Sequence, residues 1–299
     1  MKPIVLITGA NGMLATHLAK VLEKNYTLKF LTRIVKSSNE YLWDLKTGFI
    51  DPQALKEVNH IIHLAGSSIA DKRWTLKRKQ HIFSSRVDSA QLILEQLIKN
   101  KQVIDTFISA SAIGYYGATT TDNIFTEESP AGNDFLSTVC SKWEQAAYSF
   151  VENNVAKRIS IVRMGIILAK NEGALKKIVQ PIKLELGCGL GTGKQWMPWI
   201  HIEDLCNMYK FILDNQRLQG TFNAVAPEHL TNQELTLEIA SRLNRKIYLP
   251  NIPAFIIRLL FGKRAVILLE GSRVSSGKII STGFVFEYTA VRKALNNLL

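Results

Sequence analysis

The sequence predicts an α/β protein built on a doubly wound parallel sheet, and two observations carry this prediction. The first half of the chain alternates apolar runs of strand length with amphipathic helices, as repeated βαβ units do. A glycine-containing turn joins the first strand to the first helix. We therefore expect right-handed crossovers and a ligand at the carboxyl ends of the strands.

Residues 4–7 form the first predicted strand, because consecutive apolar residues are typical of a strand that is buried on both faces. The following helix has an apolar stripe with the spacing of one helix face, made by Leu14, Leu18, Val21 and Leu22. Strand, turn and helix thus begin the first βαβ unit.

The turn between them contains Gly9 and Gly12 and is followed by Ala15. Gly9 permits a tight turn, Gly12 lets the backbone approach a diphosphate, and Ala15 lets the helix lie close to the strand. The helix N-terminus adds unpaired N–H groups, which favour phosphate. We therefore predict a dinucleotide site. Its expected contacts in this turn are Gly9, Asn11, Gly12, Met13 and Leu14.

Further strands are predicted where short apolar runs recur, at residues 28–32, 41–43, 61–66, 106–109 and 159–162. The helices between them are predicted over residues 52–58, 87–98 and 136–151. Asp51 supplies an N-cap for the first of these helices, and Pro52 suits its first helical position. Together these elements complete a Rossmann-type sheet.

The second half of the chain is less regular. We expect residues 1–168 to form the dinucleotide-binding core, with 198–226 returning to it. Residues 169–197 and 227–299 should form a smaller substrate-side lobe that includes the C-terminal segment. The glycine-rich stretch 187–193 follows no predicted strand, which favours a flexible loop over a second nucleotide motif.

Two features of the later chain predict helices. Thr231 and Glu234 have the spacing of a capping box, which indicates a helix N-terminus. Residues 252–269 are strongly apolar but are interrupted by Gly262 and by basic residues, so they do not read as a membrane span. We expect a packed helix pair there, with an amphipathic contact to a membrane surface as the alternative.

The composition of the 299 residues is that of a globular protein, with 46% hydrophobic residues and a net charge of +12. This charge favours anionic ligands, but the basic residues are dispersed without a nucleic-acid motif, so nucleic-acid binding is not expected. Cys140, Cys188 and Cys206 form no CxxC pair, which indicates reduced thiols in a cytoplasmic protein. No signal peptide and no metal-ligand spacing is recognised.

The end of the second strand bears on which dinucleotide is bound. An NAD site usually places a carboxylate roughly 20 residues after the glycine turn, whereas an arginine there suits the 2′-phosphate of NADP. This chain has Thr32 and Arg33 at that place, with Lys36 nearby and no acidic residue between Arg33 and Glu40. Because a guanidinium binds phosphate and a carboxylate would repel it, we predict NADP as the cofactor.

Several other stretches carry a joint signal: His63–Gly66, Ile69, Arg73–Thr75, Ser85-Arg86, Ser109–Ala112, Gly114–Gly117, Trp143-Glu144, Arg163–Leu168, Pro198–Leu205 and Gly283-Phe284. With the glycine turn, they resemble the extended short-chain dehydrogenase/reductase superfamily. The nearest resemblance is to its NADP-binding, sugar-nucleotide epimerase-like branch, which has a C-terminal domain of unknown function. Beyond the turn, this resemblance implies cofactor contacts by Thr32, Arg33, Leu64, Ala65, Gly66, Arg86 and Ile167.

One departure from the superfamily concerns catalysis. Its enzymes use a Tyr and a Lys four residues later, on the helix after the fifth strand, to exchange a proton with a hydroxyl or carbonyl. Here those positions hold Leu136 and Cys140, or Cys140 and Glu144, depending on the register. We expect Cys140 to be a small core residue and Glu144 to be a carboxylate on the helix surface.

Three hydroxyls remain as candidate catalytic groups. Ser111 matches the catalytic serine of the superfamily and could polarise a substrate oxygen, unless a backbone group satisfies it. Tyr115 or Tyr116 could donate a proton, or could instead pack against the cofactor or substrate. Candidates for the substrate cleft are Arg73, Trp74, Gln195, Trp199 and His201. For His201, which precedes Asp204, a structural turn is the alternative.

The sequence therefore predicts an NADP(H)-dependent oxidoreductase or nucleoside-diphosphate-sugar epimerase-like protein. Hydride would pass to or from a carbonyl or hydroxyl carbon of a small molecule, such as a nucleotide sugar or a carbonyl compound. The alternative is a non-catalytic NADP(H)-binding sensor or interaction module, because the Tyr and Lys pair is absent. Neither nucleic acid nor a membrane is expected as a partner, and a homodimer stays open.

Overall fold

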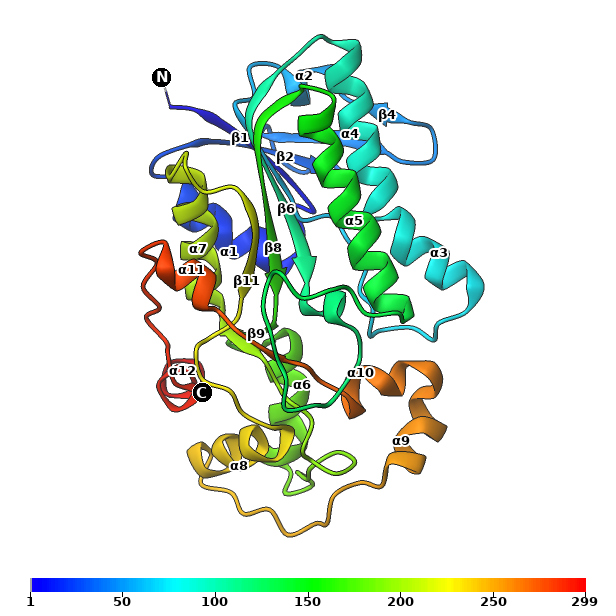
Figure 1. Ribbon diagram of the computed structural model, residues 1–299, viewed down its shortest axis with the longest axis vertical. Helices are drawn as coiled ribbons and strands as arrows, with labels where there is room; N and C mark the ends of the chain where they lie inside the picture. Colours follow the sequence, from blue (N-terminus) through cyan, green and yellow to red (C-terminus); the bar gives the residue numbers. More distant parts are fainter. Residues whose placement is uncertain (1) are drawn as a thin grey trace.

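The computed structural model describes residues 2–299 and is built around one eight-stranded sheet (Figure 1). The strand order is β11-β8-β6-β5-β1-β2-β3-β4, and every neighbouring pair is parallel except β3 and β4 at one edge. This confirms the predicted doubly wound sheet. The strands are β1 (Ile4–Thr8), β2 (Thr27–Thr32), β3 (Glu40–Asp44), β4 (Phe49–Ile50), β5 (His60–His63), β6 (Ile104–Ala112), β8 (Ala156–Met164) and β11 (Gly220–Ala224).

Helices cover both faces of this sheet (Figure 1). Val5 and Ile7 of β1 pack into one apolar layer and Leu6 into the other, which explains why the strand is apolar throughout. The first layer is covered by α1 (Met13–Leu22), α7 (Ile202–Asp214) and α11 (Gly277–Ser281). The second is covered by α2 (Pro52–Leu55), α4 (Val87–Lys99) and α5 (Phe135–Glu152), with α3 (Leu76–Ser84) beside α4.

The carboxyl ends of β6 and β8 point toward a second group of elements, drawn in the lower half of Figure 1. A separate apolar cluster holds its centre together, formed largely by side chains of α6, α8 and α12. Its elements are β9 (Ile166–Ala169), α6 (Gly173–Lys183), β10 (Trp199–His201), α8 (Asn232–Arg242), α9 (Ala254–Phe261), η2 (Gly262–Ala265), α10 (Val266–Leu269) and α12 (Val291–Leu298). The 3-10 turn η1 (Ile113–Tyr116) and the short pair β7 (Ile124–Phe125) and β12 (Arg273–Val274) lie near the junction.

The capping box at the start of α8 is confirmed, because Thr231 and Glu234 exchange the expected hydrogen bonds. The glycine-rich stretch 187–193 differs from the flexible loop that we predicted. It is tied to residue Ile252 by two backbone hydrogen bonds of 2.9 Å, and Leu190 N donates to the Asn232 side chain at 2.9 Å. Long-range hydrogen bonds thus order a segment whose local sequence indicates only a loop.

The helix predicted over residues 52–58 is shorter in the structure. The backbone becomes extended at Lys56 and adopts a positive φ of 59° at Glu57, so α2 ends at Leu55. The sheet edge strand β4 and the helix α3 were not predicted from the sequence. Thr75 caps α3 by accepting a hydrogen bond from Arg78 N at 3.2 Å.

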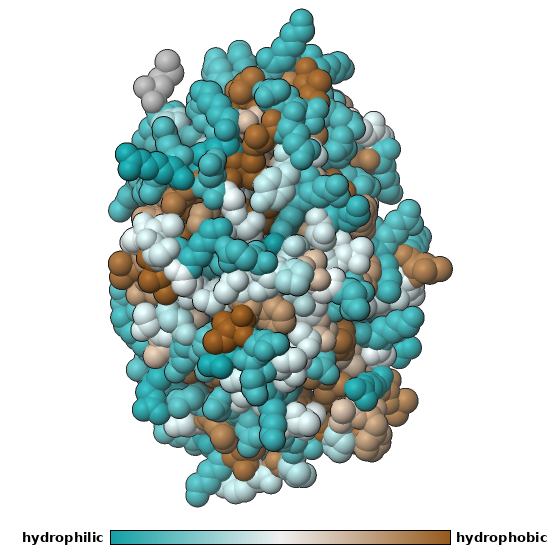
Figure 2. Space-filling model, viewed as in Figure 1, coloured by the Kyte–Doolittle hydropathy of each residue, from teal (hydrophilic) through white to brown (hydrophobic). Residues whose placement is uncertain are grey.

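The predicted packed helix pair over residues 252–269 is wrong in its packing. Only Ile257 is buried in α9, no residue of α10 is buried, and Phe255 and Leu259 are 70% and 78% exposed. Figure 2 shows hydrophobic side chains at the lower right, where α9 lies in Figure 1. Within residues 2–299, no helix is both long enough and apolar enough to cross a membrane.

His63 lies at the end of β5 and is fully buried. Its Nδ1 accepts a hydrogen bond from Trp143 Nε1 at 3.2 Å, so the proton sits on Nε2, which faces Ser89 Oγ at 2.9 Å. Burial, followed by the charge of Arg86, lowers the pKa of His63 to about 3. The imidazole is therefore a neutral bridge between the sheet, α4 and α5.

We predict that this imidazole makes the protein sensitive to acid. Because the pKa of His63 is about 3 when folded and about 6.5 when unfolded, its contribution is complete above pH 6.5. It is lost as the pH falls toward 3, by about 1.4 kcal/mol of unfolding free energy for each pH unit. Urea unfolding between pH 7.5 and 5 should show a shallower pH dependence for His63→Gln, which cannot be protonated, and equal slopes would contradict the assignment.

Candidate active site

The glycine turn packs closely against the residues that follow β5. Gly9 has a φ of 76°, and a Cβ on it would lie 3.1 Å from the backbone oxygen of Leu64. Thr8 Oγ1 accepts hydrogen bonds from Leu64 N and Ala65 N at 3.0 and 2.9 Å. Gly12 precedes α1 without a side-chain cap and without an acidic residue in the first turn. The N–H groups of this helix end are therefore oriented to receive an anion.

Other predicted cofactor residues gather around this turn. Asn11 Nδ2 lies 3.4 Å from Thr32 Oγ1, which links the turn to the end of β2. The guanidinium of Arg86 lies against Gly66, where a Cβ would be 3.0 Å from its Cζ. Burial lowers the pKa of Arg86 to about 10. The guanidinium of Arg86 therefore lies close to the carboxyl end of β5.

The segment between β9 and α6 returns to the same turn. Gly173 begins α6 with a φ of 55°, and a Cβ on it would lie 3.3 Å from Met13 Sδ and 3.9 Å from the backbone oxygen of Ile167. Met13 and Ile167, which are far apart in the sequence, thus both lie close to Gly173. Leu14, by contrast, faces the core and is 8% exposed.

Arg33 is exposed at the end of β2, and its charge acts on His81 of α3. The pKa of His81 on α3 is lowered first by burial and then by the charges of Arg78, Arg33, Lys72 and Arg86. Sequence reasoning identified Arg33 and Arg86 but missed Arg78, because α3 itself was not predicted. Its signal was Thr75, a good N-cap three residues before Arg78.

A buried ion pair joins the carboxyl end of β8 to α5. Arg163 Nε and Nη2 donate to the two carboxylate oxygens of Glu144, each at 2.8 Å, and Ser111 Oγ donates to Glu144 Oε1 at 2.6 Å. The prediction that Glu144 lies on the helix surface is therefore wrong, since its side chain is 6% exposed. Burial opposes the charge on Arg163, but the hydrogen bonds and charge of Glu144 outweigh it and raise the pKa of Arg163.

Arg163 also holds both tyrosines of η1. Its Nη1 donates to the hydroxyl of Tyr116 at 3.0 Å, and that hydroxyl donates to Asn223 Oδ1 at 2.6 Å. Burial raises the pKa of Tyr116 to about 12. The guanidinium carbon lies 3.4 Å from the ring centre of Tyr115, which is only half-buried. The structure thus brings Ser111, Tyr115 and Tyr116 together around one arginine.

The fold agrees with the comparisons to known proteins. Residues 5–224 match the NAD dependent epimerase/dehydratase family. The chain belongs to this family. Residues 252–298 match a second model, a domain of unknown function called DUF1731.

Relatives extend this match over the whole chain. The epimerase family protein YfhF of Bacillus subtilis is 33% identical, with 99% of this chain and 97% of the relative covered. The crystal structure of human epimerase family protein SDR39U1 with NADPH has a TM-score of 0.89 at 28% identity, covering 99% of this chain and 98% of the human one. A nucleoside-diphosphate sugar epimerase from Corynebacterium glutamicum has a TM-score of 0.81 at 26% identity, covering all of this chain and 58% of that chain.

Cys140 is buried, as predicted for a small core residue. It lies beside Ser111 and Glu144, and burial, followed by the charge of Glu144, raises the pKa of its thiol to about 12. At neutral pH it is therefore an uncharged thiol and a poor nucleophile. In residues 2–299, no three His, Cys, Asp or Glu side chains are grouped in a way that could hold a metal ion.

Of the five residues considered for a substrate cleft, three are buried: Gln195, Trp199 and His201 are at most 1% exposed. The ring of His201 stacks on Tyr288 at 3.7 Å and its Nδ1 accepts from Glu203 N, which fits the structural turn. Trp74 is half-buried against Phe135, and Arg73 is exposed.

We predict that Glu144→Gln destabilises the protein by about 3 kcal/mol, because it leaves the buried Arg163 charge without its counter-charge. Asp105→Asn serves as the matched control. It removes the exposed ion pair with Lys157, whose side chains are 43% and 70% exposed, and should change stability by less than about 1 kcal/mol. Urea unfolding measures both, and similar losses in the two variants would contradict a special role for the buried pair.

Proposed function

We propose that this protein binds NADP(H) and transfers hydride to or from a carbonyl or hydroxyl carbon of a small molecule. The family assignment supports a dinucleotide site, and the similar human protein was crystallised with NADPH. The residues around the glycine turn fit a dinucleotide. They include two glycines without room for side chains, an uncapped helix N-terminus and a nearby guanidinium. Together they would hold the diphosphate.

The preference for NADP over NAD depends on the cations around His81. After burial, the charges of Arg78, Arg33, Lys72 and Arg86 lower the pKa of this histidine. Glu40, the first acid after Arg33, instead accepts a hydrogen bond from Lys36 N at 2.6 Å. This local positive field would bind the additional phosphate on the adenosine ribose.

When bound, the nicotinamide would supply the hydride chemistry, while the chain supplies orientation and a proton. Of the three candidate hydroxyls, Ser111 donates to Glu144 and Tyr116 donates to Asn223. Tyr115 has no hydrogen-bond partner for its hydroxyl among the residues described, and its ring is fixed by Arg163. We assign Tyr115 as the proton donor, and Ser111 and Tyr116 as residues that position it through Arg163.

A second candidate is an NADP(H)-binding sensor without turnover. It is favoured by the two α5 residues that face Ser111, which are Cys140 and Glu144 rather than Tyr and Lys. The thiol is protonated and the carboxylate is neutralised by Arg163, so neither offers the usual proton transfer. This candidate predicts cofactor binding and thermal stabilisation by NADPH, with no oxidation of it.

We expect the protein to bind NADPH more tightly than NADH. Arg33→Ala should weaken NADPH binding by about tenfold or more and leave NADH binding unchanged, because only NADPH carries the 2′-phosphate. Fluorescence titration with both cofactors measures this. Arg217→Ala removes an exposed charge elsewhere and is the control. Equal affinities for the two cofactors in the unmodified protein would refute the proposed selectivity.

We also expect Tyr115→Phe to lower NADPH oxidation with aldehyde and ketone substrates by about 10²–10⁴-fold, the usual contribution of a positioned acid. NADPH binding should be unchanged, since the ring still stacks on Arg163. Tyr148→Phe, on the partly exposed side of α5, is the matched control. Full activity in Tyr115→Phe would rule out this proton donor, and tight NADPH binding without turnover by the unmodified protein would favour the sensor.

A further inference from the structure

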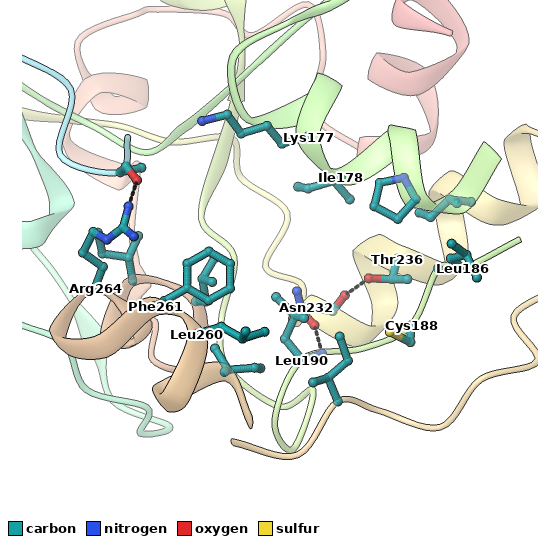
Figure 3. A pocket seen from close by; sticks show the side chains of 18 residues that line it. Lys177, Ile178, Leu186, Cys188, Leu190, Asn232, Thr236, Leu260, Phe261 and Arg264 are labelled. Carbon is teal, nitrogen blue, oxygen red and sulfur yellow. Dashed lines mark hydrogen bonds between the residues drawn. The ribbon is translucent and has the colours of Figure 1, made fainter. Parts of the chain in front are cut away.

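A pocket of about 380 Å³ lies away from the residues assigned above. It is formed by α6, α8, the loop around residues 187–190 and the α9–α10 segment (Figure 3). Ala70 from the loop after β5 also lines it. Pockets that bind small molecules usually have volumes of about 300–1,000 Å³. The pocket therefore has the size of a ligand site and spans the two parts of the molecule.

The lining of this pocket is mainly apolar. Its apolar side chains include Ile178, Ile182, Leu190, Leu260, Phe261 and Leu268. Leu260 and Phe261 are also 60% and 38% exposed, so a bound molecule would cover apolar surface that α9 otherwise presents to water. A nucleotide sugar would leave many polar groups without hydrogen bonds against these walls. The lining therefore favours a ligand with an aliphatic or aromatic body.

Two polar side chains in the lining, Asn232 and Arg264, can orient a ligand in the pocket. Asn232 Oδ1 accepts a hydrogen bond from Leu190 N at 2.9 Å, and Figure 3 shows the amide nitrogen of Asn232 turned toward the pocket. Arg264 Nη1 donates to the backbone oxygen of Ala70 at 2.6 Å, while its Nε is buried without a hydrogen-bond partner in the described structure. The amide of Asn232 and the guanidinium of Arg264 both carry hydrogen-bond donors, so they can bind oxygen atoms of a ligand.

Two cations line the pocket, and in the described structure only one of them forms an ion pair with a carboxylate. Lys177 lies 3.2 Å from Asp71 and is neutralised by it. Arg264 has no carboxylate partner among residues 2–299. Arg264 donates to Ala70 of the loop after β5. In Figure 3 it lies across the pocket from Thr236, Cys188 and Leu186. A negative group would therefore face this loop, and the apolar body would point toward α8.

We infer that this pocket binds an amphipathic organic anion, with a carboxylate or similar oxygen group at Arg264 and an aliphatic or aromatic body between α6 and α9. This inference names the ligand class of a second site, separate from the proposed hydride transfer. The binding site does not depend on that reaction, because its lining includes neither residues of the glycine turn nor Ser111, Tyr115 or Tyr116.

Calorimetric titration with hexanoate, octanoate and decanoate, in the absence of any dinucleotide, tests this site. We expect one molecule per chain and about fourfold tighter binding for each added methylene, because each buried methylene contributes a constant increment. Ile178→Trp should abolish binding by filling the pocket, and Ile280→Trp, on α11 outside it, should not. Affinity that does not depend on chain length would overturn the assignment.

The charged end is tested by substitution of arginine. Arg264→Gln should weaken decanoate binding by about tenfold or more, and leave the binding of decanol unchanged, since only the carboxylate gains from the charge. Arg258→Gln, on α9 but outside the pocket lining, is the control. Equal losses in the two variants, or displacement of decanoate by UDP-glucose, would refute the inference. Failure of these titrations would leave NADPH binding untouched, and failure to bind NADPH would leave these titrations untouched.

Discussion

The candidate catalytic residues at the carboxyl ends of β6 and β8 depend on one buried ion pair, between Glu144 on α5 and Arg163 on β8. Neither charge can be taken out of water alone, because the desolvation penalty for an unpaired ion is several kcal/mol. The two elements must therefore keep a fixed register for the pair to form. Since the same guanidinium holds Tyr115 by its ring and Tyr116 by its hydroxyl, this register also fixes the candidate catalytic loop.

Cations named for the two proposed sites come together at the loop after β5. Arg78 of α3, whose charge acts on His81, donates a hydrogen bond to the backbone oxygen of Ser68, and Arg264 donates to that of Ala70 two residues later. Glu144 and Arg163, by contrast, neutralise each other.

The loop after β5 connects the two parts of the structure. Its Asp71 pairs with Lys177 of α6, and the backbone oxygen of its Ala70 accepts from Arg264, which follows α9. The C-terminal segment matches a domain of unknown function. Through the hydrogen bond of Arg264 it contacts a loop that begins beside the glycine turn. The glycine turn and the pocket at α9 therefore both lie beside this loop.

The sequence alone determined the features that rest on local chemistry. The apolar run of β1, the glycine turn with its positive φ at Gly9, and the capping box of α8 each depend on residues close together in the chain, so pattern and residue type sufficed. Only the tertiary structure decided the burial of Glu144, since its partner Arg163 lies on another element and a lone helix carboxylate normally faces water. The order in the glycine-rich loop and the contact of Arg264 with Ala70, 194 residues away, likewise arise from packing that no local pattern encodes.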